Sequence, residues 1–113
     1  MKISKELMKG STSSLILSLL NRKQMYGYEM IKEIERRSDG VFSFKEGTLY
    51  PILHSLEFED MIESYWDDNE GNRKRKYYRI TKKGQSHLKE KEEEWTVFRK
   101  SVEKVLWEGS IWA

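Results

Sequence analysis

The first hydrophobic pattern along the chain predicts a helix from about Ser4 to Leu20. A dense apolar cluster, which should be mostly buried, stands at its end and consists of Leu15, Ile16, Leu17, Leu19 and Leu20. Small residues spaced three to four apart follow one face, in line with a leucine: Leu7, Ser11, Ser14 and Ser18. The helix therefore combines an apolar end with a stripe of small side chains.

Two further helices are indicated by apolar residues at positions i, i+3, i+4 and i+7, which is the pattern of one buried stripe. The second helix begins after Tyr26, and its stripe consists of Gly27, Met30, Ile31 and Ile34. Gly40 is placed to end the segment that follows. The third helix begins around Glu46, and its stripe consists of Leu49, Ile52, Leu53 and Leu56. Because that stripe faces the core, other side chains of the third helix should face solvent or a ligand, namely Thr48, Tyr50, Pro51 and His54.

The next segment predicts a β-hairpin followed by a long helix. The expected strands are Ile62 to Trp66 and Lys76 to Ile80, and the Asp, Asn and Gly residues between them suit a turn. Thr81 stands where the N-cap of the last helix should be, and the helical pattern continues to about Glu108. A heptad seam on this helix should pack against another helix, and it consists of Trp95, Phe98, Val102 and Val105.

These elements predict a mainly α fold with a small β-hairpin, organised as a winged helix-turn-helix plus a C-terminal dimerisation helix. We expect the winged domain at residues 1–80 and the dimerisation helix at residues 81–113. Since 37 % of the 113 residues are hydrophobic and 35 % are charged, few residues cover much apolar surface, which favours oligomerisation.

Charge is segregated along the chain although the net charge is only +2. Seven acidic and no basic residues occur from Glu57 to Asn72, and seven basic and no acidic residues occur from Arg73 to Lys83. The hairpin carries four consecutive cations that can neutralise DNA phosphates, namely Arg73, Lys74, Arg75 and Lys76. The alternative is a solvated charge run without a specific partner. The third helix supplies the matching base-reading element, since a helix can enter the major groove.

Several function classes find little support. The chain has no cysteine, no signal peptide pattern and no apolar run of membrane-spanning length, so we expect a cytoplasmic protein without membrane contact. Two histidines and no phosphate-binding glycine loop make an enzyme a weak hypothesis, and we expect no cofactor. The acidic run from Glu57 to Glu70 lacks metal-loop spacing and is better interpreted as a solvated surface than as a metal site.

Several motifs resemble the PadR family of transcriptional repressors over nearly the whole chain. They are MYGYEMIKEI, KEGTLYPILHSLEFEDMI, SYW and RKYYRIT with the following KKG. The resemblance implies a DNA-binding winged helix with a C-terminal dimerisation helix, which controls detoxification or efflux genes and is released by small aromatic effectors. By its length and single helix after the hairpin, the chain resembles the short, multidrug-sensing subfamily.

In that subfamily, a tryptophan of the last helix stacks on planar drugs at the dimer interface, and Trp95 stands at the matching position. The resemblance implies an effector cavity formed by Leu7, Ser14, Ser18, Leu88, Lys91, Trp95 and Arg99. The alternative is that Trp95 is only the largest packing residue of the seam. Lys91 and Arg99 depart from the family pattern, in which the matching positions are apolar or acidic. Their positive charges near the Trp95 ring would favour an anionic ligand over a cationic one. The alternative is that they pair with Glu92, Glu94 or Glu103 on a solvated helix.

The resulting hypothesis is a homodimeric repressor that binds a palindromic operator and responds to a planar aromatic effector. The alternative is a protein-interaction module that has the winged fold without DNA binding, since a fold does not fix a function.

Overall fold

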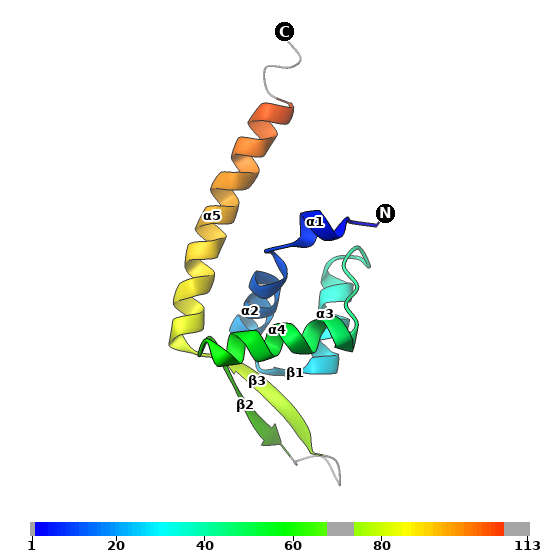
Figure 1. Cartoon of the computed structure of the whole chain (residues 1–113), viewed down its shortest axis with the longest axis vertical. Helices are drawn as coiled ribbons and strands as arrows, with labels where there is room; N and C mark the ends of the chain where they lie inside the picture. The colour runs from blue at the N-terminus through cyan, green and yellow to red at the C-terminus, as the bar shows by residue number, and fades with distance from the viewer. Residues whose placement is uncertain (1, 68–73, 108–113) are drawn as a thin grey trace.

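The structure is a computed structural model that describes residues 2–67 and 74–107 (Figure 1). Its elements, in chain order, are α1 (Lys5–Met8), α2 (Thr12–Arg22), β1 (Met25–Tyr26), α3 (Gly27–Arg37), α4 (Glu46–Phe58), β2 (Ile62–Asp67), β3 (Arg75–Ile80) and α5 (Lys82–Leu106). The fold is mostly helical with a small antiparallel sheet and a long C-terminal helix, as the sequence predicts.

One hydrophobic core joins α2, α3, α4 and the sheet. The predicted stripe of α3 is buried at all four positions, and Met30 has no exposed surface. In α4, Leu49, Leu53 and Leu56 are buried, while Ile52 packs against the core from a half-buried position. The spacing of apolar residues therefore predicted the inward faces of both helices correctly, and it leaves the opposite face of α4 for solvent or a ligand.

The sheet has three strands in the order β1-β3-β2, whereas the sequence predicted a two-stranded hairpin. Strands β2 and β3 pair from Ile62 opposite Ile80 to Asp67 opposite Arg75, one residue longer on each strand than expected. The additional strand β1 is only two residues long and pairs Met25 with Tyr78. A segment this short carries no alternation that a sequence pattern could show.

The prediction of one helix from Ser4 to Leu20 is wrong. The segment forms two helices, because α1 ends at Met8 and α2 begins at Thr12. Between them Gly10 has a φ of +87°, a left-handed conformation that breaks a right-handed helix and that glycine adopts without strain. Ser4 caps α1, and its side chain accepts a hydrogen bond from the backbone N–H of Leu7 at 3.2 Å.

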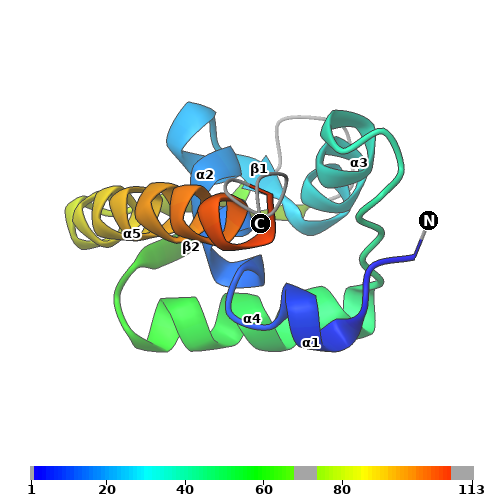
Figure 2. The same cartoon turned by 90° about the horizontal axis from the view of Figure 1, so that it is seen from above.

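Helix α5 is anchored to the winged domain at its first turns and then extends away from it (Figure 1). Thr81 is its N-cap, as predicted, and the Thr81 side chain accepts a hydrogen bond from Gly84 N–H at 3.0 Å. Only Gly84 and Leu88 of this helix are buried. Seen from above, α5 lies across α2 (Figure 2). No helix in residues 2–67 and 74–107 is both long and apolar enough to cross a membrane.

Candidate nucleic-acid interface

The outer face of α4 presents the four side chains that the sequence singled out as candidate DNA contacts. Thr48, Pro51 and His54 are exposed. Tyr50 is 38 % exposed, so part of its side chain packs on the protein. The predicted orientation of this face toward solvent is therefore correct.

Tyr50 owes its position to a glycine on the neighbouring helix. A Cβ atom added at Gly27, the first residue of α3, would lie 2.8 Å from the Tyr50 hydroxyl oxygen and 3.2 Å from the ring carbon that bears it. Any side chain at Gly27 would therefore push the tyrosine ring outward. The pattern identified Gly27 only as part of a buried stripe, and its role in seating Tyr50 emerges from the structure.

A groove of about 250 Å³ lies between the start of α3, the helix α4 and the inner side of the sheet. Tyr50 borders it from α4, and Arg75 and Lys76 border it from β3. Its remaining lining residues are Tyr26, Gly27, Tyr28, Trp66 and Tyr78. The sequence prediction did not include Tyr28, Trp66 and Tyr78 as groove residues. Trp66 stands opposite Lys76 in the pairing of β2 with β3, and this register could have indicated its place beside the groove.

The basic residues of the hairpin are not equivalent. Lys74 is exposed, whereas the Arg75 guanidinium lies 4.6 Å from the centre of the Tyr26 ring. Lys76 Nζ lies 5.6 Å from the centre of the Tyr78 ring, on the groove side of the strand. Such cation–π contacts orient a cation without neutralising it. Arg73, the first of the four predicted cations, lies outside the described residues.

Aromatic rings in contact with one another support the hairpin strands on their outer face. The Tyr77 ring lies 5.5 Å from Tyr26 and 5.8 Å from Tyr65, centre to centre. The Arg79 guanidinium lies 4.9 Å from the Tyr65 ring and donates a hydrogen bond to Glu63 at 2.7 Å. Cross-strand aromatic pairs stabilise a two-stranded ribbon by about 0.2–1 kcal/mol each. These contacts therefore hold the described strands β2 and β3 together on the side away from the groove.

Comparisons with known proteins agree with this architecture. Residues 16–90 match the sequence profile of the family described as the transcriptional regulator PadR-like family. The chain belongs to the PadR-like family of transcriptional regulators. This membership supports a DNA-binding regulator as its general role.

Individual relatives of this PadR-like chain are similar over most of its length. A transcriptional regulator from Clostridium thermocellum is 37 % identical, with a TM-score of 0.83 over 90 % of this chain and 99 % of that one. A PadR family regulator from Clostridium difficile R20291 is 36 % identical, with a TM-score of 0.75 over 86 % of this chain and 99 % of that one. The transcriptional regulator YqjI of Escherichia coli is 32 % identical over 75 % of this chain but only 39 % of its own length.

The far half of α5 in this PadR-like chain carries exposed apolar side chains. Within the predicted seam, Trp95 is 54 %, Phe98 is 55 % and Val105 is 81 % exposed, and Val102 is half-buried. The Trp95 and Phe98 rings lie 5.7 Å apart, centre to centre. A single chain thus leaves most of this seam uncovered.

The residues predicted to form an effector cavity lie on three different helices. Leu88 is buried and belongs to α5, Ser14 and Ser18 are half-buried on α2, and Leu7 is exposed on α1. The two cations that flank Trp95 along α5 both form ion pairs. Lys91 Nζ lies 3.5 Å from a carboxylate oxygen of Glu94, and Arg99 donates a hydrogen bond to Glu103 at 2.8 Å. Both glutamates are among the partners that the sequence suggested.

One buried tyrosine links the groove to the core. Burial raises the pKa of the Tyr78 hydroxyl above its usual value, and the negative charge of Glu57 adds to this effect. The Tyr78 hydroxyl therefore stays uncharged, and the Tyr78 ring provides an uncharged surface in contact with Lys76. Glu57 itself accepts a hydrogen bond of 2.5 Å from the Ser64 hydroxyl.

Proposed function

We propose that this PadR-like chain is a sequence-specific DNA-binding repressor that acts as a homodimer on a palindromic operator. Helix α4 enters the major groove, where base edges present distinguishable donors and acceptors, and the hairpin forms the wing that contacts phosphates. A regulator of this kind acts in the cytoplasm.

The observation that carries the proposal is the groove that α4 and the wing share. Tyr50 borders the groove from α4, and Arg75 and Lys76 border it from the wing. On this proposal the base-reading face of α4 adjoins the phosphate-binding side of the wing, so one duplex would contact both without rearrangement of the domain. Lys74 and Lys76 supply positive charge on the wing, and His54 offers a hydrogen-bonding side chain on the exposed face of α4.

Binding to DNA can be tested with the duplex upstream of the chain's own gene and a random duplex of equal length, each at two salt concentrations. Replacement of Lys74 and Lys76 by alanine should weaken binding to both duplexes and reduce the salt slope by about one unit per lost phosphate contact. His54→Ala should cost about 1–3 kcal/mol on the specific duplex and leave random binding nearly unchanged.

Lys100→Ala is the matched control, since Lys100 is an exposed lysine on α5 far along the chain from the wing. It changes the net charge by the same amount per residue and should leave the salt slope unaltered. Failure of the wild-type chain to bind either duplex at low salt would refute the proposal and favour the protein-interaction module.

The dimer is supported by the uncovered apolar seam of α5 and by the high charged fraction of the chain. Phe98→Glu places a charge in the seam and should convert the dimer to a monomer in sedimentation experiments, with loss of tight operator binding because linked heads bind two half-sites together. Val97→Glu is the control, because Val97 is 66 % exposed but lies outside the seam. Equal sedimentation of the two variants would refute the assignment of the seam.

The release of DNA by a planar aromatic effector is the finer part of the proposal, and it follows the short, multidrug-sensing subfamily. It is supported by the exposed Trp95 ring and by the small side chains Ser14 and Ser18 on α2. Fluorescence titration with planar ligands of opposite charge, in the wild type and in Trp95→Ala, tests it. Quenching that is equal in both proteins would mean that Trp95 is a packing residue only.

A further inference from the structure

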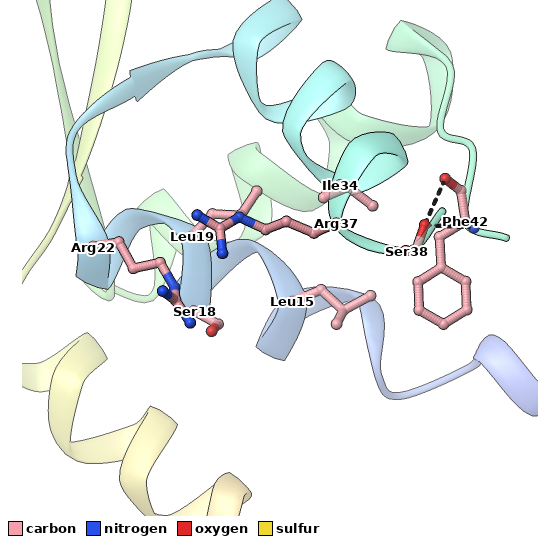
Figure 3. A pocket seen from close by; sticks show the side chains of 8 residues that line it. All are labelled: Leu15, Ser18, Leu19, Arg22, Ile34, Arg37, Ser38 and Phe42. Carbon is pink, nitrogen blue, oxygen red and sulfur yellow. Dashed lines mark hydrogen bonds between the residues drawn. The ribbon is translucent and has the colours of Figure 1, made fainter. Parts of the chain in front are cut away.

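A second cavity lies within the winged domain, between α2 and α3, away from both the groove and the seam. Its volume is about 220 Å³. Figure 3 shows its lining residues, which are Leu15, Ser18, Leu19, Arg22, Ile34, Arg37, Ser38 and Phe42. No α5 residue is among them, so this cavity differs from the effector cavity proposed around Trp95, with which it shares only Ser18.

One end of the cavity is cationic. The guanidinium groups of Arg22 and Arg37 both lie at the end formed by Ser18 and Leu19 (Figure 3). Within the described part of the chain, Arg22 has no carboxylate partner. Arg37 shares its partner, because Glu33 accepts hydrogen bonds from Arg37 at 2.8 Å and from Arg36 at 2.5 Å. The cavity lining thus contains two guanidinium groups and no carboxylate, and the one carboxylate that pairs with Arg37 is shared with Arg36, which leaves an excess of positive charge at this end.

The other end of the cavity is apolar, and the residues that line it are held in place by a hydrogen bond and by burial. Leu15, Ile34 and Phe42 line it. The loop that carries Phe42 is held by Ser38, whose hydroxyl oxygen accepts a hydrogen bond from Phe42 N–H at 2.9 Å (Figure 3). Ile34 is buried and belongs to the core. This end therefore offers a preformed hydrophobic surface.

We propose that this cavity binds a small monocarboxylate with an apolar body. The carboxylate meets Arg22 and Arg37, since guanidinium groups bind carboxylates through paired hydrogen bonds, and the apolar body lies along Leu15 and Phe42. The seven helical rises from Leu15 to Arg22 span about 10 Å, which sets the ligand length. The volume is below the roughly 300–1,000 Å³ of sites for drug-sized ligands, so a chain of about eight carbons matches it better than a polycyclic compound.

The cavity is placed to influence the DNA-contacting helix, and this step rests on the proposed DNA-binding function. Phe42 belongs to the segment between the end of α3 at Arg37 and the start of α4 at Glu46. A ligand in contact with Phe42 touches the segment that positions α4. We therefore expect occupancy of the cavity to change operator affinity.

Calorimetric titration of the full chain with octanoate, octan-1-ol and octylammonium tests the site without DNA. Octanoate should bind, octan-1-ol should bind at least about tenfold more weakly because it lacks the charge-assisted hydrogen bonds, and octylammonium should not bind. Arg22→Gln should lower octanoate affinity by about tenfold or more for the same reason. Because Arg22 is exposed, this substitution leaves the core intact.

Arg36→Gln is the matched control, since Arg36 also pairs with Glu33 but does not line the cavity. It should retain wild-type octanoate affinity, whereas Arg37→Gln should not. Equal binding of octanoate and octan-1-ol, or equal affinity in Arg22→Gln and Arg36→Gln, would overturn the site. Loss of octanoate binding in Trp95→Ala would overturn it too, because the ligand would then occupy the seam. A gel shift with octanoate tests the coupling separately: unchanged operator affinity would refute the coupling alone, and failure to bind DNA at all would instead refute the proposed function.

Discussion

The contact between Gly84 and the backbone of Met61 anchors α5, and an added methyl group tests it. A Cβ at Gly84 would lie 2.1 Å from the Met61 carbonyl oxygen and 2.7 Å from Ile80 Cγ1. The oxygen belongs to the backbone, so no change of rotamer relieves the contact. Gly84→Ala must therefore move the start of α5 away from the loop before β2.

The expected cost follows from what this movement disturbs. Real Cβ atoms essentially never approach closer than 3.0 Å, so the two segments must separate by about 1 Å. That displacement disrupts the hydrogen bond from Thr81 N–H to the Met61 carbonyl at 3.0 Å and the bond from the Thr81 hydroxyl to the Asp60 carbonyl at 2.7 Å. Overpacking costs about 1–3 kcal/mol and each lost hydrogen bond about 1 kcal/mol. Alanine gains about 1 kcal/mol in helix propensity, so a net destabilisation of roughly 2–4 kcal/mol remains.

Gly47→Ala is the internal comparison, because a Cβ at Gly47 in α4 meets no atom within 4 Å. It should be neutral or raise the free energy of unfolding by up to about 1 kcal/mol. Urea denaturation followed by circular dichroism, at one protomer concentration because dimerisation contributes to stability, measures both variants. If Gly84→Ala is as stable as Gly47→Ala, the close packing of α5 on Met61 is refuted.

Three further predictions concern the groove, the seam and the α3 surface. Gly27→Ala should displace Tyr50 and reduce specific operator binding more than random DNA binding in a gel shift; an equal loss on both duplexes would contradict the role of Gly27 in seating Tyr50. The double variant Phe98→Glu, Val105→Glu should remain folded by circular dichroism yet sediment as a monomer, and a persistent dimer would exclude the seam as the interface. Hydrogen bonding from Arg36 lowers the pKa of the Glu33 carboxyl, so ionised Glu33 stabilises the fold above the usual carboxylate pKa, and this stabilisation is lost as the pH falls below about 4.3. Glu33→Gln should therefore show a smaller decrease in urea stability between neutral and acidic pH than the wild type, and parallel curves would contradict the assignment.

The inward faces of the helices could be predicted because burial imposes a period on the sequence. Every position of the α3 stripe is buried, and the outward orientation of Thr48 and His54 followed from the stripe of α4. Thr81 was predicted as the N-cap of α5 because its hydroxyl satisfies an otherwise unpaired backbone N–H. The buried face of a helix and its N-cap depend on residues close together in the sequence, so the local sequence is sufficient to predict them.

Features that depend on contacts between distant segments could not be predicted. The strand β1 exists only because β3 provides an edge for Met25 and Tyr26. The seat of Tyr50 depends on the approach of Gly27, which lies 23 residues earlier in the chain. The break at Gly10 was missed for a different reason, since a single glycine within a helical pattern lowers the helix propensity without fixing a boundary.

The anchoring of α5 at one end makes it a lever arm. From Gly84 to Leu106 the helix spans roughly 33 Å, so a tilt of about 10° at its base moves the far end by about 6 Å. In the proposed dimer that displacement approaches the length of two base-pair steps, which are about 3.4 Å each. The tilt of α5 at the contact between Gly84 and Met61 would thus set the distance between the two DNA-binding domains of the dimer. Substitutions at this contact would change the preferred half-site spacing, although neither residue contacts the DNA or belongs to the seam.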